Sequence, residues 1–240
     1  MKFVRNVLLL ALVLSAGPHM LAADPPAKRK PKEALQAFND LIGSWRATGT
    51  PEGTREERQR GFWTETLTWE WQFKGADAWL KIAFDKGKHF SKGELHYLPE
   101  KDHYQLTLVT NDKQTLTFTG TLDDRRLTLV REDDKKKQTQ QLIVTLLHSN
   151  RFLYRYEVKP QDRPLFTKVY QVGATKEGEP FASGDGKPEC VVSGGLGTIR
   201  VSYKGKDYYV CCSGCRDAFK EEPEKYIKEF EERKAKEKGR

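Results

Sequence analysis

The four cysteines of this 240-residue chain are the residues whose type and spacing could do chemistry, and all lie in its last quarter. Cys190 is followed by twenty residues and then by Cys211, and Cys215 comes four positions after Cys211. Cys212 stands directly beside Cys211, and two adjacent side chains cannot easily face one ion. Thiolates bind soft metals, pair as disulfides or act as nucleophiles, so each use implies a different function.

The residues around the cysteines predict the elements that must position them. Residues 198–210, TIRVSYKGKDYYV, are typical of a strand, a Lys-Gly turn and a second strand, which together form a β-hairpin. We expect a helix to open at Cys215 and to be interrupted at Pro223, which suits the first turn of a second helical segment. A helix N-terminus lowers the pKa of a nearby thiol and favours metal binding or nucleophilicity. Such a fold can bring the distant Cys190 beside Cys211 and Cys215.

Metal binding is the first use to consider. Three thiolates suit Cu(I), which is soft, whereas structural Zn²⁺ normally takes four nitrogen or sulfur ligands. The C-terminal segment contains no histidine, so a fourth zinc ligand would be Cys212, a carboxylate such as Asp185 or Asp217, or water. The residues therefore favour a three-thiolate site.

The first 23 residues, MKFVRNVLLLALVLSAGPHMLAA, have the three parts of a secretory signal peptide. Lys2 and Arg5 give a positive start, and an apolar run from Val7 to Ala16 follows. That run is too short to cross a bilayer, which takes about 20 apolar residues, and Ala23 offers a small residue for cleavage. We expect an exported protein, periplasmic or secreted, with no stable membrane insertion.

Export keeps a second use of the thiols open, because cysteines usually pair in oxidising compartments. A disulfide from Cys190 to Cys211 or Cys215 would tie the hairpin to the helix and stabilise a small unit by about 3 kcal/mol. A redox-active thiol is the third alternative. The Cys-x-x-x-Cys spacing lacks the two-residue gap of thioredoxin-like sites, which counts against it.

A period of two dominates the larger part of the chain. Leu67, Trp69, Trp71 and Phe73 alternate with polar residues, which indicates a half-buried strand. Similar segments recur about ten times between turn sequences such as DKGK, PEKD and TNDK, with no room for crossover helices. Strands on short turns pair antiparallel, and a sheet of about ten twisted strands normally closes on itself. The sequence predicts a mainly β fold with an antiparallel barrel of about ten strands over residues 33–172.

Before these strands, EALQAFNDL places Leu35, Phe38 and Leu41 at helical spacing, which predicts a short amphipathic helix that acts as a lid or plug. The following IGSW, residues 42–45, resembles the Gly-x-Trp near the first strand of lipocalin-like (calycin-like) barrels. This resemblance implies a lipocalin-like barrel and, by analogy alone, a cavity for a small hydrophobic ligand. Some barrels of this size hold haem through one histidine, but we do not expect haem here, where His148 would be the candidate ligand.

The barrel segment offers no catalytic set, and we expect no enzyme activity. Its histidines lie near strand ends without the spacing of a metal pair and are expected to be surface or turn residues: His89, His96, His103 and His148. The formal net charge of +8 falls to +6 without the two basic residues of the signal peptide. Charges of both signs are interspersed, with no aromatic-basic block suited to stacking bases, so we expect no nucleic-acid binding.

The cysteine-containing segment closely resembles the YHS domain of the wider TRASH group. The pattern of that group is a cysteine, about twenty residues and Cys-x-x-x-Cys, with Tyr-Tyr or Tyr-Phe before the pair and a Phe…Pro-x-x-Tyr tail after it. The residues in register are Cys190, Tyr208, Tyr209, Cys211, Cys215, Phe219, Pro223 and Tyr226. The resemblance implies a heavy-metal module, usually for copper, with Cys190, Cys211 and Cys215 as ligands and an open role for Cys212. It also implies a small apolar core made of Tyr209, Phe219 and Tyr226.

The chain is therefore expected to divide into six parts. These are a signal peptide (1–23), a flexible lead-in (24–32), a lipocalin-like barrel (33–172), a Gly-rich linker (173–187), a YHS/TRASH-like domain of zinc-ribbon-like or treble-clef-like form (188–230) and a charged tail (231–240). We expect an exported heavy-metal-binding protein, with copper as its ion and zinc as the alternative. The competing hypothesis is a lipocalin-like protein that binds a small apolar ligand and whose C-terminal cysteines form structural disulfides.

Overall fold

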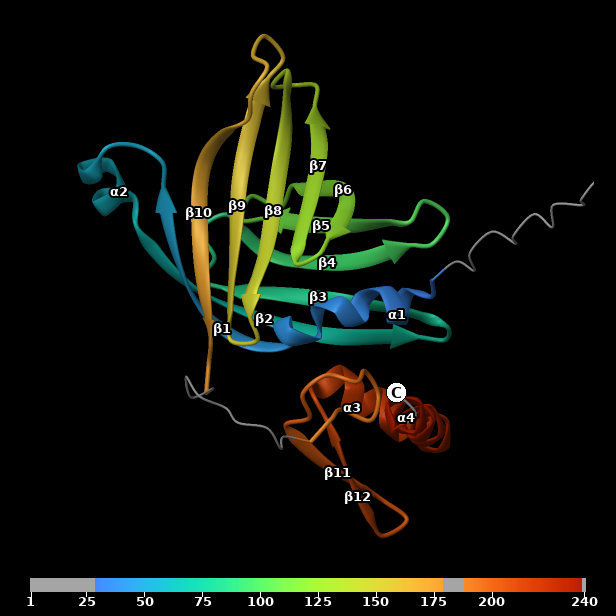
Figure 1. The fold of residues 1–240 in the computed structure, drawn as a ribbon. Helices are drawn as coiled ribbons and strands as arrows, with labels where there is room; N and C mark the ends of the chain where they lie inside the picture. Colours follow the sequence, from blue (N-terminus) through green and yellow to red (C-terminus); the bar gives the residue numbers. More distant parts are fainter. Residues whose placement is uncertain (1–28, 179–187, 239–240) are drawn as a thin grey trace, which may run out of the picture.

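The computed structural model describes residues 29–178 and 188–238, which form a β-barrel with a smaller unit packed against one end (Figure 1). The expected signal peptide, most of the lead-in and most of the linker lie outside the described residues. Within the described ranges, no helix has both the length and the apolar character that a bilayer span requires.

Ten antiparallel strands close into a barrel, in which each strand pairs with its neighbours in sequence and β1 closes the ring against β10. This confirms the predicted mainly β fold. The strands are β1 (Gly43–Pro51), β2 (Trp63–Lys74), β3 (Asp77–Asp85), β4 (Phe90–Leu98), β5 (His103–Thr110), β6 (Thr115–Asp123), β7 (Arg126–Asp133), β8 (Gln138–His148), β9 (Arg151–Pro160) and β10 (Thr167–Lys176). β10 runs past the boundary that we expected at residue 172, because Gly173 pairs with Thr48 of β1 on one side and with Leu153 of β9 on the other.

The period of two in the sequence sets which side chains fill the barrel. In β2, Leu67, Trp69 and Trp71 are buried and alternate with half-buried polar residues that face outward. Trp45 of β1 meets Phe152 of β9 edge to face, with 4.8 Å between ring centroids. The barrel core is therefore built largely from aromatic and leucine side chains of strands that lie far apart in sequence.

A short helical segment covers the end of the barrel that faces the smaller unit (Figure 1). It consists of the α-helix α1 (Pro31–Leu35) and the 3₁₀-helix η1 (Gln36–Leu41), and we call the two together the lid helix. Phe38 is fully buried and packs edge to face on Tyr104 of β5, whose hydroxyl donates to the backbone of Ala34. The predicted helix begins two residues earlier than expected, at Pro31, which suits the first turn of a helix.

One helix lies in the connection between the first two strands. α2 (Arg55–Gly61) links β1 to β2, and none of its residues is buried. Its N-terminus has a capping box in which the Glu57 backbone N–H donates to the Thr54 hydroxyl and the Thr54 N–H donates to the Glu57 carboxylate. Because the helix has no apolar face, hydrophobic periodicity could not reveal it.

The C-terminal unit contains the predicted hairpin and two helices. The hairpin is β11 (Ile199–Tyr203) and β12 (Lys206–Val210), and both residues of its turn, Lys204 and Gly205, have positive φ, as a type I′ turn requires. The helices are α3 (Ser213–Glu221) and α4 (Pro223–Lys238). The helix break at Pro223 is where the sequence predicted it, but α4 continues through the segment that we expected to be a charged tail.

The C-terminal unit does not have a separate core. Its buried residues and those of the barrel form one continuous hydrophobic cluster. Phe73 of β2 stacks on Trp71 and also contacts the ring of Tyr226 in α4, at 6.3 Å between centroids. Packing on the barrel is therefore a source of stability for this small unit.

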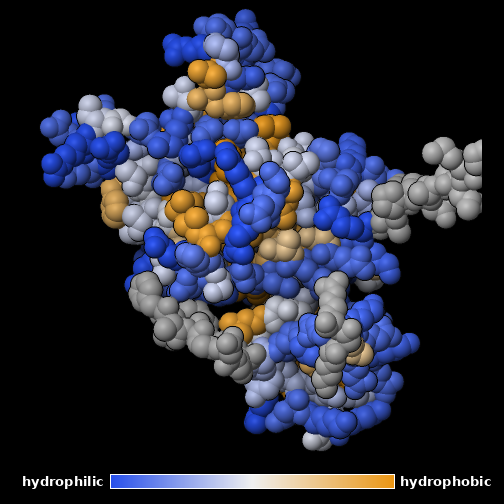
Figure 2. All heavy atoms as spheres, viewed as in Figure 1, coloured by the Kyte–Doolittle hydropathy of each residue, from blue (hydrophilic) through white to orange (hydrophobic). Residues whose placement is uncertain are grey.

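The outer surface is largely hydrophilic, with apolar residues scattered between charged ones (Figure 2). The exposed large hydrophobic residues of the described ranges are Phe62, Val130, Leu147, Leu165 and Val169. Most charged side chains that pair across this surface are well exposed, and such ion pairs contribute about 0 to 1 kcal/mol each. The fold is therefore stabilised mainly by its apolar interior.

Candidate metal centre

Three cysteines from three separate elements meet inside the C-terminal unit. The sulfur atoms of Cys190, Cys211 and Cys215 all lie within 4.8 Å of one another, and Cys211 and Cys215 are 3.4 Å apart. Cys190 and Cys215 are fully buried, and Cys211 is 8% exposed. Within the described part of the chain, this is the one cluster of histidine, cysteine or carboxylate side chains with the geometry to hold a metal ion.

The backbone around Cys190 explains how the distant thiol reaches the local pair. Residues 190–195, which we call the cysteine loop, turn back so that the Cys190 N–H donates to the Gly195 carbonyl. Gly194 adopts a φ of +78°, which glycine tolerates and other residues rarely do. The Val191 N–H donates to the carbonyl of Tyr209, and this bond holds the loop alongside β12. Cys211 follows that strand at once, so loop and hairpin place the two sulfur atoms together.

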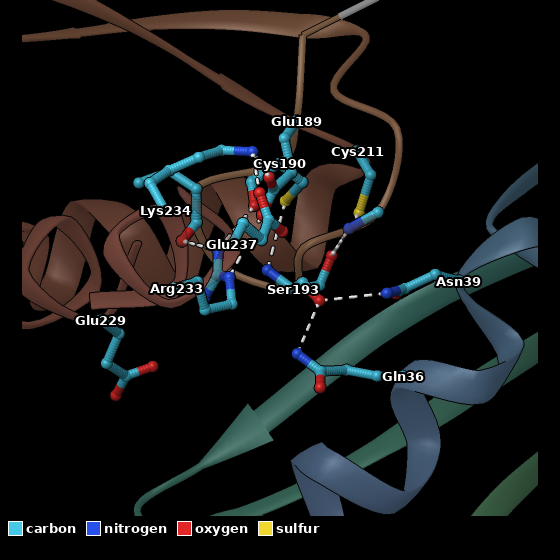
Figure 3. A network of polar contacts seen from close by, with 12 residues as sticks. Gln36, Asn39, Glu189, Cys190, Ser193, Cys211, Glu229, Arg233, Lys234 and Glu237 are labelled. Atoms are coloured by element: carbon cyan, nitrogen blue, oxygen red, sulfur yellow. Dashed lines mark hydrogen bonds and ion pairs between the residues drawn. The ribbon is translucent and has the colours of Figure 1, made fainter. Parts of the chain in front are cut away.

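Ser193 contacts two of the three sulfur atoms and is itself fully buried. Its backbone N–H donates to the Cys190 sulfur at 3.4 Å, and its hydroxyl oxygen lies 3.4 Å from the Cys211 sulfur (Figure 3). An N–H directed at sulfur favours the thiolate form. Sequence reasoning missed Ser193, because a serine in a Gly-rich loop carries no spacing signal of its own.

The thiols shift one another's protonation. Hydrogen bonds from the Cys211 and Cys215 thiols lower the pKa of Cys190. Burial, followed by the hydrogen bonds to its neighbours, raises the pKa of Cys215 well above its ordinary value, and hydrogen bonds to Cys190 and Cys212 raise the pKa of Cys211. The thiols therefore shift one another's pKa in opposite directions, and a cation bound to them would displace their protons.

Cys212 lies beside the cluster but outside it. Its sulfur is 3.9 Å from that of Cys211 and accepts a hydrogen bond from the backbone N–H of Trp71 in the barrel, at 3.4 Å. Hydrogen bonds from Cys211 and Cys215 lower the pKa of Cys212. The position that the sequence left open is thus a contact between the two units.

The donor set fits a soft metal ion. Metal–sulfur bonds of about 2.3 Å to one ion require sulfur–sulfur separations of about 3.8 to 4.0 Å, which agrees with the spacing of these three thiols to within a small adjustment. The alternative zinc ligands are not in place. Asp217 is exposed and pairs with Arg216, while Asp185 lies outside the described residues.

Side chains of the last helix, α4, contact the cysteine loop and the residue before it. The Arg233 guanidinium donates to the carbonyls of Cys190 and Val191, at 3.3 and 3.2 Å, and pairs with Glu189 at 3.1 Å (Figure 3). Lys234 also pairs with Glu189. Arg233 and Lys234 both lie in the segment expected to be a charged tail, 231–240, and in the structure they belong to α4.

The residues that the resemblance placed in a small apolar core are buried to different degrees. Phe219 and Tyr226 are buried, whereas Tyr209 is half-buried beside Gly197. The core is completed by Val191, Val192, Val210 and Ala218. These side chains belong to the hydrophobic cluster that continues into the barrel.

The histidines of the barrel do not join any metal site in the described residues. His89 is half-buried and stacks on Tyr170 at 4.3 Å between ring centroids, and His96 stacks on Trp79. His148, the candidate haem ligand, is exposed at the end of β8. Two of the four thus serve as aromatic surface packing, for which strand-end position gave no signal.

The barrel interior is filled mainly by its own side chains. An apolar cavity lined in part by Leu67, Trp69, Phe152 and Tyr154 has a volume of about 20 Å³. That is room for about one water molecule, whereas sites for small ligands are about 300 to 1,000 Å³.

The fold and the site together define a closed ten-stranded barrel that carries a three-thiol unit at its lid-covered end. Residues 198–229 match the family model of the YHS domain, so the chain has a YHS domain at its C-terminus. The match includes Cys211 and Cys215, while Cys190 precedes it and joins the site through the fold.

Two solved structures are similar to the barrel part. One is described as EF1p2_mFAP2b bound to DFHBI, with 12% identity, a TM-score of 0.26, and coverage of 60% of this chain and 99% of that chain. The other is a redesigned beta barrel, mFAP1, bound to DFHBI, with 15% identity, a TM-score of 0.25, and coverage of 59% and 99%. No curated protein matches the chain.

Proposed function

We propose that this protein is an exported heavy-metal-binding protein whose C-terminal unit holds a copper ion on Cys190, Cys211 and Cys215. The observation that carries the proposal is the meeting of three buried thiols, from a loop, a strand end and a helix, within 4.8 Å of one another. Three buried thiols brought this close from separate elements form a donor set that suits a soft metal ion.

Copper is favoured over zinc by the number of ligands. Cu(I) is soft and accepts low coordination, whereas structural zinc takes four ligands. The thiol that lies nearest to the three, Cys212, is bonded to the backbone of Trp71. The three thiols therefore form a site that suits Cu(I) without a further ligand from the described residues.

Binding, rather than catalysis, is the role that these residues support. The sulfur-bearing residues are between 0% and 8% exposed, which leaves little room for an organic substrate. Export is supported by residues 1–23, which have the basic start and apolar run of a signal peptide. A copper site in an exported protein must also compete with disulfide formation, and burial of the thiols slows their oxidation.

The test is metal content by mass spectrometry together with a count of free thiols, on the full chain prepared under reducing conditions with copper or zinc added. We expect about one equivalent of metal in the wild type and its loss in Cys190→Ser, Cys211→Ser and Cys215→Ser. Cys212→Ser is the matched control, because it makes the same chemical change outside the three-thiol group and should retain the metal.

The result that would overturn the proposal is a protein without metal in which the thiols are reduced and the fold is intact. Oxidation of all four cysteines in freshly purified protein would also overturn it and would favour structural disulfides instead. Binding of zinc with higher affinity than Cu(I) would retain the three-thiol site and reject copper as its ion.

A further inference from the structure

The lid helix of the barrel is hydrogen-bonded to the cysteine loop at Ser193. The carbonyl of Ser193 accepts two side-chain hydrogen bonds from the lid helix, from Gln36 Nε2 and from Asn39 Nδ2, each at 3.0 Å (Figure 3). The N–H and the hydroxyl of the same serine are the groups that lie against the sulfur atoms of Cys190 and Cys211. A single buried residue thus connects the barrel to two of the three thiols.

The orientation of Asn39 is itself fixed by the barrel. Its Oδ1 accepts a hydrogen bond from the Trp71 indole Nε1 at 3.2 Å, so its Nδ2 is the group left to donate to Ser193. On the other side of the site, the Trp71 backbone N–H donates to the sulfur of Cys212. Contacts from the barrel therefore reach the cysteines both through the loop and through the start of α3.

Gln36 and Asn39 hold the serine in place from a direction that the C-terminal unit cannot supply. Gly195, next in the loop, lies so close to Asn39 that an added Cβ would sit 3.0 Å from the Asn39 Cβ. Groups that orient metal ligands in this way typically change metal affinity by about 10- to 100-fold when they are removed.

We propose that Gln36 and Asn39 are positioning residues of the thiol site, so that the barrel forms part of the metal-binding apparatus. This inference rests on the proposed function. It concerns residues that lie about 150 positions from the cysteines and outside the segment that matches the YHS domain.

The experiment uses full-length protein, with Cu(I) as the probe under reducing, oxygen-free conditions. Gln36→Met removes one donor without adding charge, and Asn39→Asp replaces the other donor while keeping an acceptor for Trp71. Asp40→Asn is the matched control, because Asp40 lies on the same lid helix but pairs with Arg125. The readouts are Cu(I) affinity, by competition with a chromogenic chelator, and the ultraviolet absorption of the copper–thiolate bonds.

We expect each of the two variants to bind Cu(I) about tenfold more weakly than the wild type, with a changed absorption and an unchanged stoichiometry. Asp40→Asn should match the wild type in both readouts. Urea unfolding of the metal-free proteins checks that the variants are folded. If Asn39→Asp does not fold, Gln36→Met, which changes a half-buried position, carries the test alone.

Wild-type affinity and absorption in both folded variants would overturn the inference, even if they unfold at lower urea concentration, because that result would show a structural role alone. The proposed function would still stand in that case, provided that the cysteine variants lose the metal. Absence of Cu(I) binding by the wild type would overturn both.

Discussion

Replacement of Gly214 by alanine tests whether the two units are docked as closely as the structure shows. Gly214 lies in the first turn of α3, where this helix meets β2 of the barrel. A Cβ at this position would lie 1.6 Å from the carbonyl oxygen of Trp71, whereas ordinary contact begins at 3.4 Å. The helix would therefore have to withdraw by about 2 Å, because the Trp71 carbonyl belongs to the backbone of a paired strand.

The size of the effect follows from the contacts beside Gly214. Withdrawal would break the hydrogen bond from the Ser213 hydroxyl to Glu70, at 2.9 Å, and the one from Trp71 to Cys212. Two such bonds contribute about 2 kcal/mol, and strain from overpacking costs a further ~1 kcal/mol or more. Alanine returns about 1 kcal/mol through its higher helix propensity. We expect a net loss of about 2 kcal/mol.

The assay is urea unfolding of the reduced, metal-free full chain, followed by circular dichroism and tryptophan fluorescence. Gly173→Ala is the matched control, since its added Cβ would meet only Leu153, at an ordinary 3.4 Å. The sign of the change is decisive, because the same substitution in a helix free of the barrel would stabilise it. Unchanged or increased stability of Gly214→Ala would refute the close packing of α3 on β2.

Three further substitutions test other parts of the molecule. Burial lowers the pKa of His89 below its ordinary 6.5, so the unfolded state binds the proton more tightly and the protein should lose stability as the pH falls through 6.5. The urea midpoint of His89→Gln should fall less over this pH range than that of the wild type. An equal fall in the two proteins would contradict this. Arg233→Ala removes the side-chain donor to the carbonyls of Cys190 and Val191 and should lower the free energy of unfolding by about 2 kcal/mol. A change below about 0.5 kcal/mol would show a surface role. Tyr154→Phe removes a donor from the buried carboxylate of Glu65 and should lower the free energy of unfolding by about 1 to 3 kcal/mol. A double-mutant cycle with Glu65→Gln that shows no coupling energy would exclude this contact.

The barrel was predictable because its information is local. Alternation along each strand and short turns between strands are enough to specify antiparallel neighbours, and a sheet of ten strands then closes. What could not be predicted depends on contacts outside this pattern. The exposed helix α2 has no apolar face, and β10 continues through Gly173 because it is paired on both sides.

The candidate site likewise contains residues that could be predicted from the sequence and residues that could not. The spacing around a hairpin predicted that the fold can bring Cys190 beside Cys211 and Cys215, and in the structure the three sulfur atoms lie together. Ser193 and Asn39 had no such signal, because Ser193 lies in a loop without periodicity and Asn39 contacts it through a hydrogen bond across the interface between the units. A polar residue that acts at long range in sequence has no periodicity by which it can be recognised.

The position of the thiol site gives the barrel and the C-terminal unit a thermodynamic connection. The hydrogen bonds that hold Ser193 against the lid helix also hold the C-terminal unit on the barrel. Docking of the two units and metal binding by the thiols would therefore depend on the same bonds. Coupling of this kind is reciprocal: a tenfold gain in metal affinity from docking implies that metal binding strengthens docking by about 1.4 kcal/mol. With a cavity of about 20 Å³, the barrel has little capacity as a container. Its contacts with the cysteine loop instead support the proposal that the barrel forms part of the metal-binding site.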